Sequence, residues 1–160
     1  MSRESIRIDG ASAQFDGRSF DLNEIVYQAA RDFSRTRGSH IALALDTTAG
    51  LPRIKGDRDQ LICVVYSLIS RAADEGSQWI GVRTWMENER VRLSVSDETS
   101  KPAWPFIVEQ CAGIVSEHQG EMFSWRTENG SVHTLQLPRC EADPTNSSKT
   151  VTLLQDSTCS

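Results

Sequence analysis

The sequence predicts an α/β fold: a two-layer sandwich in which a mixed, mostly antiparallel sheet carries about three helices on one face. Two observations favour this class. Segments whose apolar residues recur at helical spacing alternate with segments in which apolar and polar residues alternate. Their order is strand, helix, strand, helix, hairpin, helix, hairpin, which is typical of helices packed on one face of a sheet. A chain of 160 residues suffices for one domain with an ordinary core.

The first part of the chain contains one predicted helix and one predicted strand. Residues 1–20 alternate weakly and are interpreted as an N-terminal arm or short strands. Asp21 and Glu24 form a D-x-x-E capping pattern, and the helical spacing that follows ends near Gly38, a residue suited to a C-cap. Large and small apolar residues alternate over 41–45, which predicts a strand covered on both faces.

The middle of the chain contains the clearest helical pattern. It begins after Asp57, a natural N-cap, and continues to about Glu75. Its apolar residues repeat at intervals of three and four: Leu61, Val64, Val65, Leu68, Ile69 and Ala72. Residues 79–85 and 91–95 then alternate apolar and polar side chains around a short connection, so we expect a hairpin.

The last part of the chain is predicted to add a helix and a second hairpin. The helix covers 105–118 and has a proline in its first turn, where the missing N–H costs little. Residues 122–125 and 132–137 form the final strand pair. The predicted domain therefore spans 21–138, and the polar segment 139–160 is interpreted as a flexible C-terminal tail.

Composition excludes several classes of function. The net charge is −5 and the isoelectric point is near 5.2, with no clustered basic segment, which argues against nonspecific nucleic-acid binding. No apolar run is long enough to span a membrane, and the N-terminus lacks the pattern of a secretory signal. We therefore expect a cytoplasmic protein with no membrane partner.

Cysteine and histidine residues show no metal-binding pattern. The cysteines are Cys63, Cys111, Cys140 and Cys159, and the histidines are His40, His118 and His133. None of them forms a CxxC pair or has ligand spacing, so structural or incidental roles are expected and no metal site is predicted.

Tryptophans and adjacent acidic residues are further candidates for functional roles. Trp79 and Trp85 share strand parity and are interpreted as sheet core beneath the helices. Trp104 precedes the helix that begins at Pro105 and is predicted to fill a pocket or anchor a partner. The acidic pairs 74–75 and 97–98 are interpreted as solvated faces.

The stretch Leu51–Gly76, LPRIKGDRDQLICVVYSLISRAADEG, resembles the LPxxxGDxxxLxxVxxNLLxNAxKF signature of the histidine-kinase-type ATPase domain, of the GHKL superfamily. RLSVSDE (92–98) is similar to the family's strand that ends in an adenine-reading aspartate. Residues 105–138 resemble its closing helix, HGG-type turn and last strands. The resemblance covers about 20–138 and implies a Bergerat-like fold.

The resemblance breaks where the family binds metal and phosphate. There, an asparagine on the long helix holds Mg²⁺ and a nearby lysine helps to neutralise the phosphates. Ser67 and Arg71 stand at the two asparagine positions, and Asp74 stands near the lysine position. Arginine offers only hydrogen-bond donors and cannot ligate Mg²⁺, which requires oxygen ligands. Asp74 would bring a negative charge toward phosphates.

The glycine-rich lid of the family is also altered. Its glycine positions hold Thr99, Lys101, Pro105 and Ile107, which implies a shortened lid that cannot wrap a triphosphate. Asp97 is retained. It either reads adenine, as in the family, or caps the turn after its strand.

Gly130 and Ser131 lie near the family's final glycine-threonine pair. Together with Ser67, Arg71, Asp74, Asp97 and Thr99, they form the predicted remnant of a nucleotide pocket. About twenty residues precede the first predicted helix, which leaves no room for the hairpin that carries the family's phosphorylated histidine.

The leading hypothesis is a degenerate ATPase-like domain that acts as a non-catalytic regulatory protein in two-component-type signalling. Its implied partner is a histidine kinase's helical hairpin or a response regulator. ATP and Mg²⁺ are expected to bind weakly or not at all. Two alternatives stay open: a metal-independent purine-nucleotide module in which Asp97 reads the base and Arg71 binds a phosphate, or ATP-dependent phosphotransfer in trans.

Overall fold

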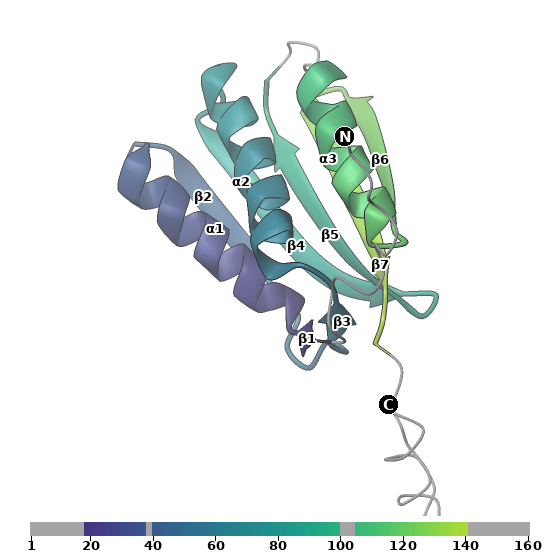
Figure 1. Ribbon diagram of the computed structural model, residues 1–160. Helices are drawn as coiled ribbons and strands as arrows, with labels where there is room; N and C mark the ends of the chain where they lie inside the picture. Colours follow the sequence, from purple (N-terminus) through teal and green to yellow (C-terminus); the bar gives the residue numbers. More distant parts are fainter. Residues whose placement is uncertain (1–17, 38–39, 100–104, 141–160) are drawn as a thin grey trace, which may run out of the picture.

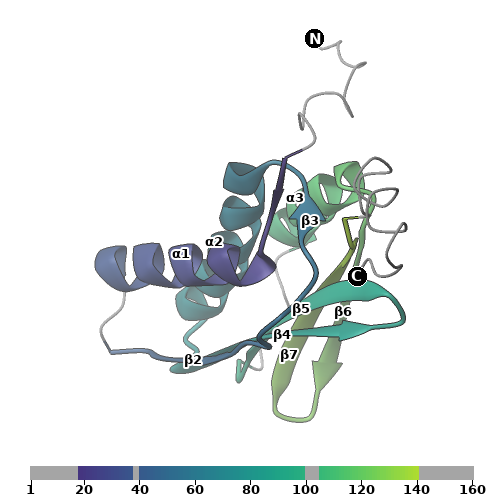
Figure 2. The same cartoon turned by 90° about the horizontal axis from the view of Figure 1, so that it is seen from below.

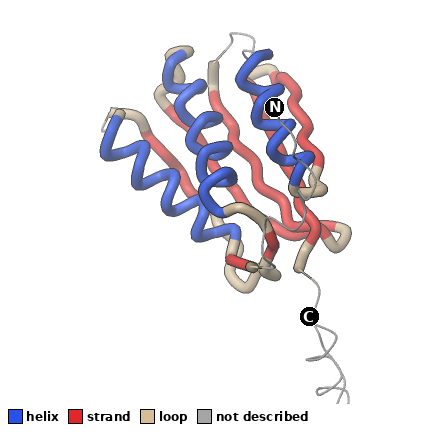
Figure 3. Tube along the Cα trace, viewed as in Figure 1, coloured by secondary structure: helices blue, strands red, loops and turns tan. Residues whose placement is uncertain are grey.

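The computed structural model describes residues 18–37, 40–99 and 105–140. Within these residues it confirms the predicted architecture, because three helices cover one face of a five-stranded mixed sheet (Figures 1 and 3). Figure 2 shows the helical layer and the sheet as two layers. No helix in this described part is long and apolar enough to cross a membrane.

The elements follow the predicted order with one addition. The helices are α1 (Leu22–Thr36), α2 (Arg58–Asp74) and α3 (Pro105–Glu117). The strands are β1 (Ser19–Phe20), β2 (Ala42–Asp46), β3 (Ile54–Lys55), β4 (Trp79–Glu87), β5 (Arg90–Asp97), β6 (Glu121–Thr127) and β7 (Gly130–Pro138). The addition is β3, which lies between the predicted strand 41–45 and the helix that begins after Asp57, and pairs with β1 in a separate two-stranded sheet.

The large sheet has the strand order β2-β4-β5-β7-β6. β2 runs parallel to β4, and the other neighbouring pairs are antiparallel. The β4–β5 turn places Asn88 and Glu89 at φ values of 54° and 65°, the left-handed conformation that two-residue hairpin turns require. The hairpin predicted around this connection is therefore confirmed.

Both predicted N-caps are present, whereas the predicted C-cap Gly38 lies outside the described residues. The Asp21 side chain accepts a hydrogen bond from the Asn23 N–H at the start of α1. The Asp57 side chain accepts one from the Gln60 N–H at the start of α2. Each carboxylate satisfies a backbone donor that has no partner within its helix.

α2 is the central helix and supplies the middle of the core. It lies between α1 and α3 over the sheet (Figure 1). Its predicted apolar face is buried as expected: Leu61, Val64, Val65, Leu68, Ile69 and Ala72. This packing fixes where the last turn of α2 meets the sheet.

His118 fastens the start of α2 to the end of α3. Its Nε2 accepts from the Asp57 N–H at 2.9 Å, and its Nδ1 lies 2.8 Å from the Ile114 carbonyl oxygen. Gly56 lies against the ring, since a Cβ there would be 2.2 Å from the imidazole. The histidine therefore has a structural role in joining two helices.

The prediction that residues 41–45 are covered on both faces is wrong. β2 is an edge strand, and the helices cover only one face of the sheet. Ile41 and Leu43 pack against the core, whereas Leu45 is 39% exposed. Alternation of large and small apolar residues here reflects one covered face.

The placement of Trp79 and Trp85 in the core is also wrong. The buried residues of β4 are Ile80, Val82 and Thr84, which have the opposite parity. Trp79 and Trp85 consequently lie on the face without helices, and Trp79 is 42% exposed. Alternation identified two faces of the strand but not which face the helices would cover.

The helical cysteines differ in environment, which predicts different reactivity. Cys63 is exposed, whereas Cys111 is buried, and burial, followed by the neighbouring Cys63, raises the pKa of Cys111 to about 11. Because the thiolate is the reactive form, iodoacetamide is expected to modify Cys63 well before Cys111 in the folded protein. Peptide mass spectrometry after timed alkylation measures both rates, and equal rates would contradict the described burial.

Candidate functional site

The last turn of α2 brings a buried arginine to the end of β5. Arg71 donates from Nη1 to Glu75 Oε1 and from Nη2 to Asp97 Oδ2, each at 2.6 Å. The side chains of Arg71, Glu75 and Asp97 are 1%, 3% and 0% exposed. We call these three residues the buried ion cluster.

Asp97 has both carboxylate oxygens engaged. Oδ2 accepts from Arg71, and Oδ1 accepts from the backbone N–H of Thr99 at 3.0 Å. The Thr99 hydroxyl donates to the Glu75 carbonyl oxygen at 3.3 Å, which ties the same turn to the end of α2. Asp97 therefore caps the turn after its strand while also forming an ion pair.

β7 closes the cluster from the other side. Ser131 is directly opposite Asp97 in the β5–β7 register and is 2% exposed. Gly130 precedes it, and a Cβ on Gly130 would lie 1.8 Å from the Asp97 carbonyl oxygen. Only a glycine allows the two strands to approach this closely without a shift of the backbone.

This close approach predicts a large difference between two glycine substitutions. Gly130→Ala is expected to lower the free energy of unfolding by about 1–3 kcal/mol or more, because the methyl group meets rigid backbone. Gly113→Ala on α3 meets nothing within 4 Å and is expected to raise it by about 0.5–1 kcal/mol. Urea unfolding of both variants checks this, and equal effects would contradict the described contact.

His133 lies beside the buried ion cluster on β7. It is 1% exposed, and its Nδ1 lies 2.7 Å from the Ser124 hydroxyl. Burial, followed by the positive charge of Arg71, lowers the pKa of His133 to about 4, and Asp97 opposes this shift. Its imidazole is therefore neutral at physiological pH.

The other predicted residues lie in different surroundings. Ser67 is half-buried on α2, one turn before Arg71. Asp74 is not part of the cluster, because its side chain is 60% exposed and pairs with Arg37 after α1. Glu75, the C-cap residue that directly follows Asp74, points inward instead, and its side chain is 3% exposed. Lys101 and Trp104 lie outside the described residues.

Three residues of this region were missed or misinterpreted from the sequence. Glu75 and Asp97 were interpreted as solvated, yet they are 6% and 5% exposed as whole residues. Arg71 and Glu75 are four residues apart on a predicted helix, a spacing that favours ion pairs and could have identified them. His133 carried no signal, since only the β5–β7 register places it near Arg71.

The electrostatics of the cluster are those of a fixed cation between two carboxylates. Arg71 is permanently charged and offers its planar guanidinium to both acids. Its Nε and the second Glu75 oxygen are buried without a hydrogen-bond partner among the described residues. No group of three or more metal-ligating side chains occurs in that same part of the chain. In this arrangement the Arg71 side chain, and not a metal ion, neutralises the charge of the two carboxylates.

The fold can be compared with solved structures. The catalytic domain of the histidine kinase ThkA, in a nucleotide-free form, matches with a TM-score of 0.66 and 22% identity over 76% of this chain and 96% of that domain. The ATP-binding domain of PrrB from Mycobacterium tuberculosis matches with a TM-score of 0.64 and 18% identity over 76% of this chain and 96% of that one.

A third match is ThkA in complex with the response regulator protein TrrA, with a TM-score of 0.63 and 23% identity over 76% of this chain and 41% of that chain. The sequence matches no protein-family model and no curated protein. These similarities show that the chain has the fold of histidine-kinase ATP-binding domains, as its resemblance implied.

Proposed function

We propose that this protein is a histidine-kinase-type ATPase domain that has lost nucleotide turnover and acts by binding a signalling protein. The observation that carries the proposal is the state of Asp97. The aspartate that the resemblance makes the adenine reader is fully buried, with one oxygen on Arg71 and the other on Thr99.

A nucleotide would have to displace these contacts. The amino group of adenine would have to reach a carboxylate whose side chain is 0% exposed and whose two oxygens are held by Arg71 and by the Thr99 N–H. A metal ion would need oxygen ligands near Arg71, whose charge repels it. Breaking a buried ion pair leaves an uncompensated charge, which costs several kcal/mol. The cluster therefore supports a domain that does not bind Mg-ATP.

The same contacts weigh against a metal-independent nucleotide module. In that alternative Arg71 binds a phosphate and Asp97 reads the base, but the two side chains are paired with each other. Arg71 is also 1% exposed and holds Glu75. A phosphate would have to compete with two carboxylates that are already desolvated.

A signalling partner is proposed by analogy with the similar structures. The ThkA kinase has been solved with a response regulator protein, which provides a precedent for a protein partner of this fold. For this chain the candidates are a response regulator or the helical hairpin of a histidine kinase in two-component-type signalling. A cytoplasmic setting is part of the same proposal.

Isothermal titration with Mg-ATP, and with ATP in EDTA, tests the loss of nucleotide binding. We expect no heat of binding in either arm. Micromolar, Mg²⁺-dependent binding would overturn the proposal. Binding that survives EDTA and is lost in Asp97→Asn would instead support the metal-independent module.

A labelled-phosphate assay tests activity in trans. The protein is incubated with radiolabelled ATP and the phosphoacceptor hairpins of candidate histidine kinases, with an active kinase ATP-binding domain as the positive control. We expect label on the hairpin only in the control. Transfer by this chain would show that it is an enzyme.

A further inference from the structure

We propose that the helix-free face of the large sheet is the interface through which two copies of this chain associate. We call this surface the open face; its lining residues are on strands β2, β4, β5, β6 and β7. It is separate from the buried ion cluster, which lies on the helical side. The inference goes beyond the proposed function and does not depend on it.

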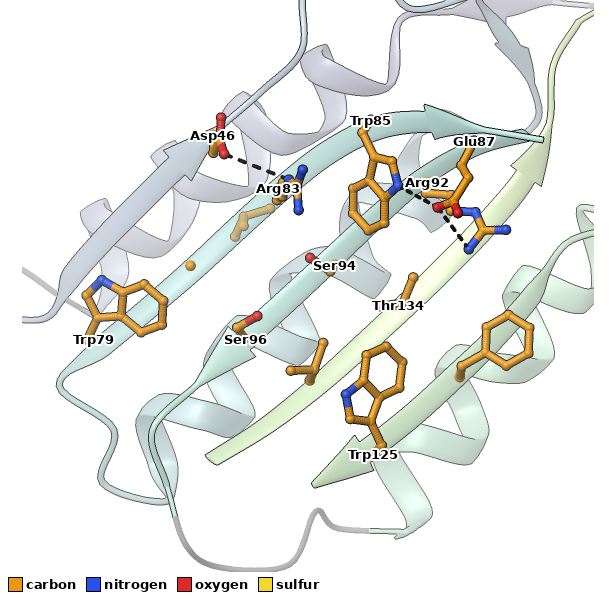
Figure 4. A pocket seen from close by; sticks show the side chains of 14 residues that line it. Asp46, Trp79, Arg83, Trp85, Glu87, Arg92, Ser94, Ser96, Trp125 and Thr134 are labelled. Carbon is orange, nitrogen blue, oxygen red and sulfur yellow. Dashed lines mark hydrogen bonds and ion pairs between the residues drawn. The ribbon is translucent and has the colours of Figure 1, made fainter. Parts of the chain in front are cut away.

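Aromatic side chains form two rows on the open face, one on β4 and one on β6, with β5 and β7 between them. Trp79 and Trp85 project from β4, and Trp125 projects from β6 (Figure 4). Phe123, also on β6, lines the same groove. Phe123 and Trp125 are 44% and 48% exposed. Aromatic residues are enriched at protein interfaces because they bury large areas at a small entropy cost.

The strands between the aromatic residues provide a floor of small side chains. Ser94 and Ser96 on β5, with Val132 and Thr134 on β7, line this floor. The Trp79 ring lies over Gly81, where a Cβ would be 2.7 Å from the indole. The result is a groove of about 770 Å³.

A second open face has the shape to occupy this groove. Facing sheets pack about 10 Å apart with interdigitated side chains, so raised residues of one sheet require low positions in the other. The open face contains both, since the β6 aromatics are raised and the β5 and β7 floor is low. In a two-fold contact, the same row on each copy can enter the groove of the other.

The area is sufficient for a specific dimer. Five strands at about 4.8 Å spacing and five to nine residues in length give a footprint of roughly 600 Å² per copy. Two copies would then bury about 1,200 Å², the lower end of the range for specific protein interfaces. The open face alone therefore provides enough contact area for a dimer, and no other part of the chain is needed.

The charges on the open face suit self-association. The exposed pair Asp46 and Arg83 is 3.8 Å apart, and Glu87 and Arg92 are 3.6 Å apart. These four charges cancel, whereas the whole chain has a net charge of −5. Two copies can therefore approach through this face without the repulsion expected elsewhere, and Arg83 of one copy can pair with an acid of the other.

Analytical ultracentrifugation of the full chain over a range of micromolar concentrations tests this inference. We expect a reversible dimer. Trp125→Arg is expected to raise the dimer dissociation constant about 30-fold or more, as loss of an interface hot spot does. Ser96→Arg, which fills the floor, is expected to have a similar effect. Tyr27→Arg is the matched control, because Tyr27 on α1 is an aromatic residue of comparable exposure, 44%.

Circular dichroism establishes that each variant is folded, and Ser96→Arg decides the result if Trp125→Arg does not fold. Loss of the dimer in the open-face variants but not in Tyr27→Arg supports the inference. A wild-type protein that stays monomeric at every concentration overturns the inference, and the occupant of the open face would then be a different protein. A dimer that both open-face variants preserve also overturns it.

Discussion

Arg71→Met is expected to lower the free energy of unfolding by about 3–5 kcal/mol, because it leaves two buried carboxylates without their cation. Methionine preserves most of the length of the side chain, so the loss reports mainly on charge. The Arg71 side chain is 1% exposed, and those of its partners Glu75 and Asp97 are 3% and 0% exposed. Urea unfolding at neutral pH measures the difference.

A matched control separates the buried cluster from an ordinary surface pair. Arg37→Met removes the partner of Asp74, whose side chain is 60% exposed. An exposed ion pair contributes about 0–1 kcal/mol, so this variant should be close to wild type. Further replacement of Glu75 and Asp97 by Gln and Asn in Arg71→Met should recover part of the loss. Similar losses for Arg71→Met and Arg37→Met would refute the cluster.

The second large effect is a pH dependence caused by His133. The unfolded histidine binds a proton near the ordinary pKa of 6.5, whereas burial lowers the pKa in the folded state to about 4. Between these values the unfolded state binds more protons, so stability is present above 6.5 and decreases as the pH falls toward 4. The loss from about pH 7 to about pH 5 should be about 2 kcal/mol.

His133→Asn isolates this contribution. The variant keeps a polar group near Ser124 but does not titrate, so the difference between wild type and variant removes the contributions of other groups. Urea unfolding at both pH values gives the two slopes. If His133→Asn loses as much stability on acidification as wild type, His133 is not the group responsible.

The fold was predictable from sequence because its signals are local. Helical spacing located α2 and its cap at Asp57, and alternation located the two hairpins. The covered face of β4 was not predictable, because alternation assigns residues to two faces without saying which one receives helices. Trp79 and Trp85 were misplaced for that reason.

The candidate site was predictable only in part. The resemblance placed Arg71 and Asp97 in one region, but their direct pairing depends on how the last turn of α2 packs over the end of β5. The burial of Glu75 rather than Asp74 depends on helix rotation by a single residue. His133 depends on strand register. Each of these is a tertiary relationship that no local pattern contains.

The most direct measurement of the central claim is the NMR signal of the Arg71 side chain during titration with millimolar Mg-ATP. Arg71→Met assigns the signal, and amides of Asp97 and Thr99 report on the same turn. If the Arg71 guanidinium fills the place where related domains bind the nucleotide, all three signals remain unchanged. This holds even at Mg-ATP concentrations high enough to detect weak binding. Saturable shifts confined to these residues would contradict the account, because they would show a nucleotide entering the cluster.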